Sequence, residues 1–284
     1  MKARWGLVLA GPFLFSFVLL AASQLVFLKA SLFADLGFGK VSAHLDLTNY
    51  LRILTDRHYL YILWLTTYIS AIVAACCIVA GFPIAYVLGR LRSRWATVLL
   101  SAIVLTSFVT IVIQIFGLII IFRADGPINR ALLGLGLIAR PFSLVGNVGG
   151  VVLGLVYSSF GFAVMLMYSM VRTIPVSLEE AAAIHGARRL RVFLRVILPL
   201  SLPALIVGFL TIFNLCMGAF TSAALLGGGR ILTLPVLIQR TMLLDVKYGM
   251  AGALAAILLV FVALLNLLSI GVLKRFRAAR LVLS

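Results

Sequence analysis

The sequence predicts an all-α membrane protein with six transmembrane helices. Of its 284 residues, 64% are hydrophobic and only 11% are charged, whereas about 25% of the residues in soluble globular domains are charged. The mean hydropathy is +1.22. The hydrophobic residues occur in long runs rather than in the short alternating segments of β-barrels. The composition therefore excludes a soluble domain, a disordered chain and a disulfide scaffold.

Six segments without Asp, Glu, Lys or Arg are long enough to cross a bilayer, which takes about 20 apolar residues in a helix. Helices are required because unpaired backbone groups cannot face lipid. The first segment exceeds the apolar core of a signal peptide, and five more segments follow it, so we expect it to be retained. One transmembrane domain over 1–284 would then contain spans at about 5–30, 59–89, 95–122, 144–171, 198–226 and 248–273.

The charges predict which side of the membrane each connection occupies. The net charge is +17. With six spans both termini share one side, and that side collects 14 basic residues and two Glu, against 10 basic residues and five Asp on the other. The positive-inside rule then places the termini and the connections at 90–94 and 172–195 in the cytoplasm. The connections expected outside are about 29–57, 123–140 and 230–247. A basic cytoplasmic face suits anionic membrane lipid, and we expect no nucleic acid partner.

A short helix is predicted in the long cytoplasmic connection after the fourth span. Ser177 and Glu180 have the spacing of a capping box, and three consecutive alanines follow. Gly186 lies where a C′ glycine ends a helix. We therefore expect a helix of about two turns at about 178–186. Because so short a helix is marginal alone, it needs a partner, either the lipid surface or another protein.

The residues Glu180-Ala-Ala, Gly186 and Ile197-Leu-Pro199 together resemble the EAA motif of the membrane subunits of binding-protein-dependent ABC importers. The resemblance implies a type I importer permease in the bacterial inner membrane. In that family the short helix is the coupling helix, docked in a groove on the cytoplasmic ATPase. The residues that would transmit the movement of the ATPase are then Ser177, Glu179, Glu180, Ala181, Ala182, Gly186 and Ala187.

Further runs resemble the spermidine/putrescine subgroup, and within it the first of two paired permeases. These runs are Asn49-Tyr50, Gly81 to Tyr86, Asn129 to Leu137, Leu198 to Pro203 and Leu225 to Gly228. The resemblance implies four partners besides membrane lipid: a homologous second permease, two ATP-binding cassette subunits and a periplasmic solute-binding protein. The transport would proceed by alternating access.

The sequence lacks the residue patterns of nucleotide binding and of enzyme chemistry. No G-x-x-x-x-G-K-[ST] loop occurs, so ATP and Mg would bind the partner ATPase. No Ser/His/Asp set or paired carboxylates offer chemistry on a substrate, and His185 has no second metal ligand near it in the sequence. We expect a transport subunit without a cofactor or a metal of its own.

Polar side chains inside the expected spans are candidates for a substrate path, because such groups are costly in lipid. The alternative is that Ser and Thr bond their own helix backbone, whereas the primary amides of Gln114 and Asn214 cannot face lipid without a high cost. The candidates expected along the path are Thr67, Thr110, Gln114, Tyr157, Ser158, Asn214 and Thr221.

The acidic residues leave the substrate open. All seven lie outside the apolar runs, so no carboxylate is expected within the membrane to balance a polyamine. The second permease could supply acids, or the path could bind weakly while the external binding protein holds the specificity. The substrate could also be an opine, an aminophosphonate or another non-polyamine solute. A self-sufficient secondary transporter would show an inverted repeat and a titratable group within the membrane, and we find neither in the sequence.

Overall fold

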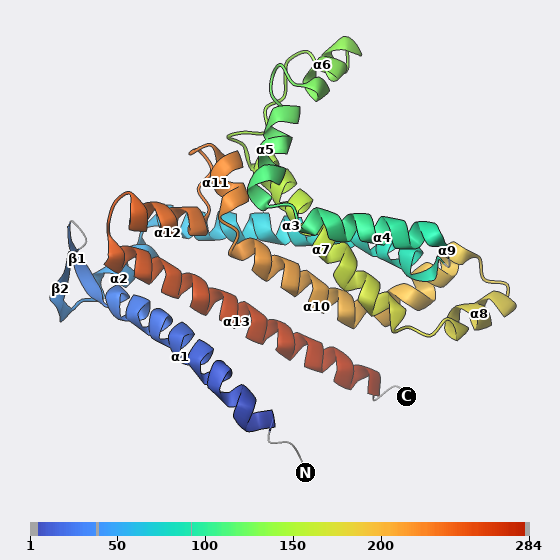
Figure 1. The fold of residues 1–284 in the computed structure, drawn as a ribbon, viewed down its shortest axis with the longest axis horizontal. Coiled ribbons are helices and arrows are strands. Elements are labelled where there is room, and N and C mark those ends of the chain that lie inside the picture. Colours follow the sequence, from blue (N-terminus) through green and yellow to red (C-terminus); the bar gives the residue numbers. More distant parts are fainter. Residues whose placement is uncertain (1–4, 38–39, 92, 282–284) are drawn as a thin grey trace. The chain divides into compact units, whose positions relative to one another are not determined.

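The computed structural model describes residues 5–37, 40–91 and 93–281, and these are mostly helical (Figure 1). Lys2, Arg4 and Arg92, which entered the charge count, lie outside these ranges. The chain forms two compact units, Met1–Leu63 with Leu234–Ala263, and Trp64–Thr233 with Leu264–Ser284. Two long helices, α3 (Arg57–Arg90) and α13 (Tyr248–Leu281), contribute to both units.

The first unit contains a β-hairpin that the sequence did not predict. Its other elements are α1 (Trp5–Ser31), α2 (Thr48–Thr55), α12 (Leu234–Leu243) and the starts of α3 and α13. The hairpin pairs β1 (Phe33–Gly37) with β2 (Lys40–Leu45), antiparallel. The Asp35 carboxylate accepts hydrogen bonds from the backbone N–H groups of Gly249 and Met250, at 2.8 Å each. A side chain of the hairpin thus satisfies N–H groups in the first turn of α13.

The second unit is built around α7 (Val148–Arg172), which packs against α4, α10 and α11. Its elements are the rest of α3 and α13, α4 (Arg94–Ser107), α5 (Ile111–Ile121), α6 (Pro127–Gly134), α7, α8 (Ser177–Ile184), α9 (Arg189–Val192), the π-helix η1 (Phe193–Ile197), α10 (Leu198–Met217) and α11 (Thr221–Gly227). In Figure 1, α8 and α9 lie at one end of this unit, away from α6.

The third expected span, 95–122, is not one continuous helix: α4 ends at Ser107 and α5 begins at Ile111. The axes of α4 and α5 meet at 98°. The Gln114 amide in α5 donates to the carbonyl oxygens of Thr106 and Val109, at 2.9 and 3.1 Å. This side chain stabilises the break because it satisfies carbonyls that have lost their helical partners. Five described helices are long and apolar enough to cross a membrane, and α4 with α5 provides a sixth if the pair is one broken span.

The fifth expected span also has different bounds. Helical structure starts at Arg189 and runs through η1 to Met217. It then stops at Gly218, and α11 is a separate helix. The helix of the fifth expected span therefore ends before 226, because apolar composition does not record where the backbone turns.

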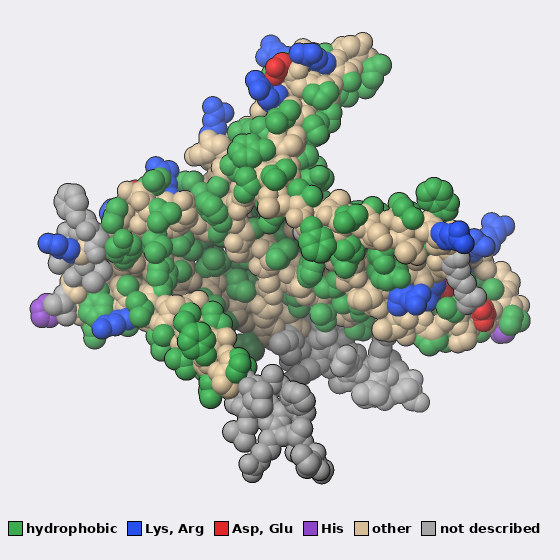
Figure 2. Space-filling model, viewed as in Figure 1, with side chains coloured by type: hydrophobic (Ala, Val, Ile, Leu, Met, Phe, Trp, Pro, Cys, Tyr) green, Lys and Arg blue, Asp and Glu red, His purple; other side chains and the backbone are tan. Residues whose placement is uncertain are grey.

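Charged and apolar side chains occupy different zones of the second unit. Figure 2 shows Lys and Arg at the end that carries α4 and α9, and again around α6, with hydrophobic side chains over the helices between. Many of the large apolar residues along α4 and α5 are exposed, including Trp95, Leu105 and Ile113 at 71%, 66% and 64%. Exposed apolar surface on this scale fits a lipid environment or a partner subunit rather than water.

Candidate coupling helix and substrate groove

The short helix predicted after the fourth span is present as α8, but the capping box is absent. The N-cap is Val176, and no side chain caps the helix. The Val176 carbonyl accepts from the N–H groups of Glu179 and Glu180, at 2.9 and 3.1 Å. Since Val176 already has helical backbone angles, the helix begins one residue earlier than the capping-box spacing requires, and Ser177 lies inside it.

The end of α8 follows the prediction made from Gly186. This glycine has φ +74°, in the left-handed region that side chains disfavour. Its N–H donates to the Ala183 carbonyl at 2.9 Å, and the Ala187 N–H donates to the Ala182 carbonyl at 3.1 Å. These two bonds form a Schellman motif. The motif ends the helix at a defined residue. No residue of α8 is buried, so the helix presents much of its surface.

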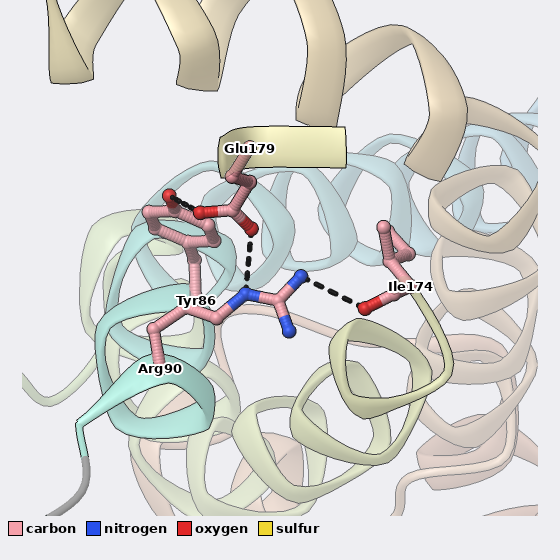
Figure 3. A network of polar contacts seen from close by, with 4 residues as sticks. All are labelled: Tyr86, Arg90, Ile174 and Glu179. Carbon is pink, nitrogen blue, oxygen red and sulfur yellow. Dashed lines mark hydrogen bonds and ion pairs between the residues drawn. The ribbon is translucent and has the colours of Figure 1, made fainter. Parts of the chain in front are cut away.

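The two glutamates of α8 have different surroundings. Glu179 Oε1 lies 2.6 Å from Arg90 Nε, and the Tyr86 hydroxyl donates to Glu179 Oε2 at 2.8 Å (Figure 3). Arg90 Nη2 also donates to the Ile174 carbonyl, at 3.0 Å. The side chains of Arg90 and Glu179 are only 16% and 17% exposed. Glu180 is exposed, and among the described residues only Glu179 of the two forms an ion pair.

An aromatic contact joins the same face of α3 to η1. The Phe193 ring lies 5.0 Å from the Tyr86 ring and 5.4 Å from the Phe82 ring, between centroids. Phe82, Tyr86 and Arg90 are four residues apart and therefore share one side of α3. Sequence reasoning counted Arg90 only as a topology charge. The sequence did hold a signal for its structural role: Arg90 ends an uncharged run and follows Phe82 and Tyr86 at a spacing of four residues, which places the three on one side of a helix.

Three of the expected path residues meet in one groove of the second unit. The groove has a volume of about 610 Å³ and lies among α3, α4, α5 and α7, with Gln114, Tyr157 and Ser158 in its wall. Thr106 adds a further hydroxyl, and the rest of the wall is apolar, without an acidic residue. Ser158 donates to the Leu155 carbonyl at 3.1 Å, as expected for a serine that bonds its own helix.

The other expected path residues do not line this groove. Thr110 occupies the exposed break before α5, and Thr67 is half-buried in α3. Thr221 is the first residue of α11. Asn214 in α10 pairs with Asn266 in α13, a residue that sequence reasoning missed. Within the ranges given above, no three His, Cys, Asp or Glu side chains gather as metal ligands would.

These features define a class: a helical, multi-pass membrane protein with a short, exposed connecting helix and a groove between its spans. Residues 78–280 match the family described as "binding-protein-dependent transport system inner membrane component", and the chain belongs to this family. It is a permease subunit of an ABC importer in the inner membrane, and it works with a partner permease, a separate ATPase and a periplasmic binding protein.

Two relatives and one solved structure are similar to most of the chain. The spermidine/putrescine transport system permease protein PotB of Escherichia coli K12 is 33% identical over 82% of this chain and 84% of its own length. PotB of Haemophilus influenzae is 30% identical over 73% of this chain and 72% of its own. A chain of a bacterial alginate ABC transporter has the same fold, with a TM-score of 0.81, 16% identity and coverage of 97% of this chain and 96% of that chain.

Proposed function

We propose that the chain moves a polyamine, or a related amine-bearing compound, from a periplasmic binding protein into the cytoplasm by alternating access. It would pair with a different but homologous permease above two ATPase subunits, with both termini in the cytoplasm. The observation that carries the substrate class is the 33% identity, over 82% of this chain, to a permease named for spermidine/putrescine transport.

We propose α8 as the place where the ATPase docks. None of its residues is buried, and the alanines after Glu180 allow another surface to approach closely. A helix of 8 residues is too short to be stable by propensity alone, which favours a bound partner. ATP binding would displace α8 and open the spans outward, and hydrolysis would reset them.

The groove at Gln114, Tyr157 and Ser158 is our candidate for part of the substrate path. Its wall is mostly apolar and holds no carboxylate, so it offers a polycation little electrostatic attraction. We infer that the path binds substrate weakly and that the external binding protein sets the specificity. The same observation favours, as the second candidate, a less cationic amine such as an opine or an aminophosphonate.

The substrate is tested by calorimetric binding of spermidine, putrescine, opines and aminophosphonates to the purified cognate binding protein. Spermidine or putrescine binding with a Kd near or below about 1 μM, a free energy of about 8 kcal/mol, supports the polyamine assignment. Binding of an opine or aminophosphonate alone replaces it with the second candidate. Uptake of the bound compound into proteoliposomes that contain the full complex then checks transport.

The coupling role of α8 is tested with substitutions that spare the membrane fold. Gly186→Pro disrupts the end of α8, and Glu180→Ala removes an exposed charge. Both should lower uptake by about tenfold or more, with insertion unchanged. Asp125→Asn is the control, because Asp125 forms an exposed ion pair with Arg123 far along the chain from α8. Normal uptake by Gly186→Pro would show that α8 does not couple the ATPase to transport.

A further inference from the structure

The ion pair of α8 is formed with α3 and not with the helices next to it in the chain. Both oxygens of the Glu179 carboxylate are engaged, one by Arg90 at 2.6 Å and one by the Tyr86 hydroxyl at 2.8 Å. Among the described residues this is the one ion pair that joins two helices. Because α3 lies far from α8 in sequence, the covalent chain does not impose this connection.

Arg90 also fixes the segment that enters α8. Its Nη2 donates to the Ile174 carbonyl at 3.0 Å, while its Nε pairs with Glu179. One guanidinium therefore holds the linker and the helix together, in the planar fork geometry that gives arginine its directional bonds. With both side chains at most 17% exposed, removal of either partner leaves a poorly hydrated charge without its counterpart.

The same side of α3 also contacts the segment that leaves α8. Phe193 of η1 packs on Tyr86 and Phe82, with centroids at 5.0 and 5.4 Å. The π-helical turn at Phe193–Ile197 lies between the short α9 and the long α10, and such turns frequently occur at functional sites. The cytoplasmic end of α3 thus holds the linker before α8, α8 itself and the turn that begins α10.

We propose that Tyr86, Arg90 and Glu179 form a strut that fixes α8 to the end of α3. When α8 is displaced, α3 moves with it, so the force enters the spans through α3 as well as through α7 and α10. The three residues are positioning residues that connect α8 to the spans without contacting substrate or nucleotide. The strut rests on the proposed docking of the ATPase on α8.

The experiment uses the whole complex of both permeases and the ATPase in lipid nanodiscs. It measures ATP hydrolysis with and without binding protein loaded with the ligand found in the calorimetric test. Glu179→Gln and Arg90→Gln should each lower the stimulation by loaded binding protein about tenfold, while the complex still assembles. Tyr86→Phe keeps the ring on Phe193 and loses one hydrogen bond, so a two- to threefold loss, about 0.5 kcal/mol, is expected.

A charge exchange and a matched control separate a strut from a general loss of structure. Arg90→Glu should abolish stimulation, and Arg90→Glu with Glu179→Arg should regain at least part of it. Asp125→Asn removes one member of the exposed ion pair with Arg123, whose side chains are 64% and 65% exposed, and should change nothing. Full stimulation in Glu179→Gln and Arg90→Gln, or no recovery in the exchanged pair, would overturn the strut.

Failure of the docking proposal is distinguishable from failure of the strut. A cysteine at the exposed position Ala183, in a chain whose Cys76, Cys77 and Cys216 are replaced by alanine, should cross-link to the ATPase in the otherwise unchanged complex. If the chain with the cysteine at Ala183 and no change at Glu179 does not cross-link to the ATPase, the docking proposal is rejected, and the strut with it. A retained cross-link together with normal stimulation in Glu179→Gln rejects the strut alone.

Discussion

Asn214 and Asn266 exchange two hydrogen bonds between α10 and α13. Asn214 Nδ2 donates to Asn266 Oδ1 at 2.9 Å, and Asn266 Nδ2 donates to Asn214 Oδ1 at 3.2 Å. Each primary amide thus offers the other one donor and one acceptor, which satisfies groups that lipid cannot hydrate. The candidate path residue Asn214 therefore has a structural role, as the link between two long helices.

The amide pair predicts coupled losses of stability. Asn214→Leu or Asn266→Leu should each lower the free energy of unfolding by about 1 kcal/mol, because the remaining amide loses both bonds of the pair. The double substitution should cost less than the sum of the single ones. Unfolding titrations in mixed micelles measure this cycle. Ser169→Ala is the control, since Ser169 is exposed and bonds the Leu166 carbonyl of its own helix. Additive losses would contradict the pairing.

Gly186 should tolerate alanine sterically but not conformationally. No atom lies within 4 Å of the position that a Cβ would occupy, yet φ is +74°. Gly186→Ala should therefore destabilise the end of α8 by about 1 kcal/mol, and Gly186→Asn by less, because asparagine adopts this region more readily. Hydrogen exchange at Ala187 reports the loss. Gly134→Ala is the control, because a Cβ at Gly134 also meets open space and the residue has no positive φ. Hydrogen exchange of the amides next to Gly134 should stay unchanged. Equal effects at both positions would contradict the conformational explanation.

Local signals in the sequence predicted the elements that depend on neighbouring residues. Uncharged runs predicted the helices observed as α1, α3, α7 and α13, because burial in lipid depends on composition along one segment. Gly186 predicted the end of α8, because a left-handed residue is a local requirement. The start of α8 was displaced by one residue, since Val176 adopts helical backbone angles and Ser177 therefore lies inside the helix instead of capping it.

Features that depend on distant residues were not predictable in the same way. Glu179 and Glu180 are adjacent and chemically alike, and only the rotation of α8 relative to Arg90 decides which one is engaged. The break before α5 depends on carbonyls that Gln114 reaches, and backbone acceptors have no signature in a sequence. The β-hairpin was missed because only its second strand, Lys40–Leu45, alternates polar and apolar residues, whereas its first strand, Phe33–Gly37, does not.

The glycines of α7 and α5 predict a graded response to alanine. A Cβ at Gly150 would strike the backbone carbonyl of Leu144, which cannot turn aside, whereas a Cβ at Gly154 would strike the flexible end of the Leu226 side chain. Overpacking of this kind costs about 1 to 3 kcal/mol. Gly150→Ala should lie at the upper end of that range and Gly154→Ala at the lower.

Gly117→Ala is the matched control for this series. No atom lies within 4 Å of the place that the new methyl group would take, and Gly117 lies in the interior of α5. Since alanine favours a helix by about 0.5 to 1 kcal/mol over glycine, the substitution should leave the thermal midpoint unchanged or raise it. Thermal unfolding of the three purified variants gives the order. A larger loss for Gly154→Ala than for Gly150→Ala would contradict the rigid contact with Leu144.

Asn129 organises the connection between α5 and α7. Its side chain is fully buried, and its Nδ2 lies within hydrogen-bond distance of the carbonyls of Phe122, Arg123 and Phe142, at 3.1, 2.7 and 2.7 Å. The Phe142 N–H donates to Asn129 Oδ1 at 2.8 Å. One amide thus joins the end of α5 to the segment before α7.

Asn129→Asp should open this connection while the surrounding helices stay folded. The substitution keeps the size and the acceptor but replaces the donor with an oxygen that faces three carbonyls, at a cost of about 3 kcal/mol for a buried group without a partner. Limited proteolysis after Arg130 should become faster, because cleavage follows local opening. Hydrogen exchange at the Phe142 N–H measures the same opening without cleavage. Arg130→Gln, which changes only the exposed surface of α6, is the control and should leave the protection of this N–H unchanged. Undiminished protection of the Phe142 N–H in Asn129→Asp would show that the amide does not hold the connection.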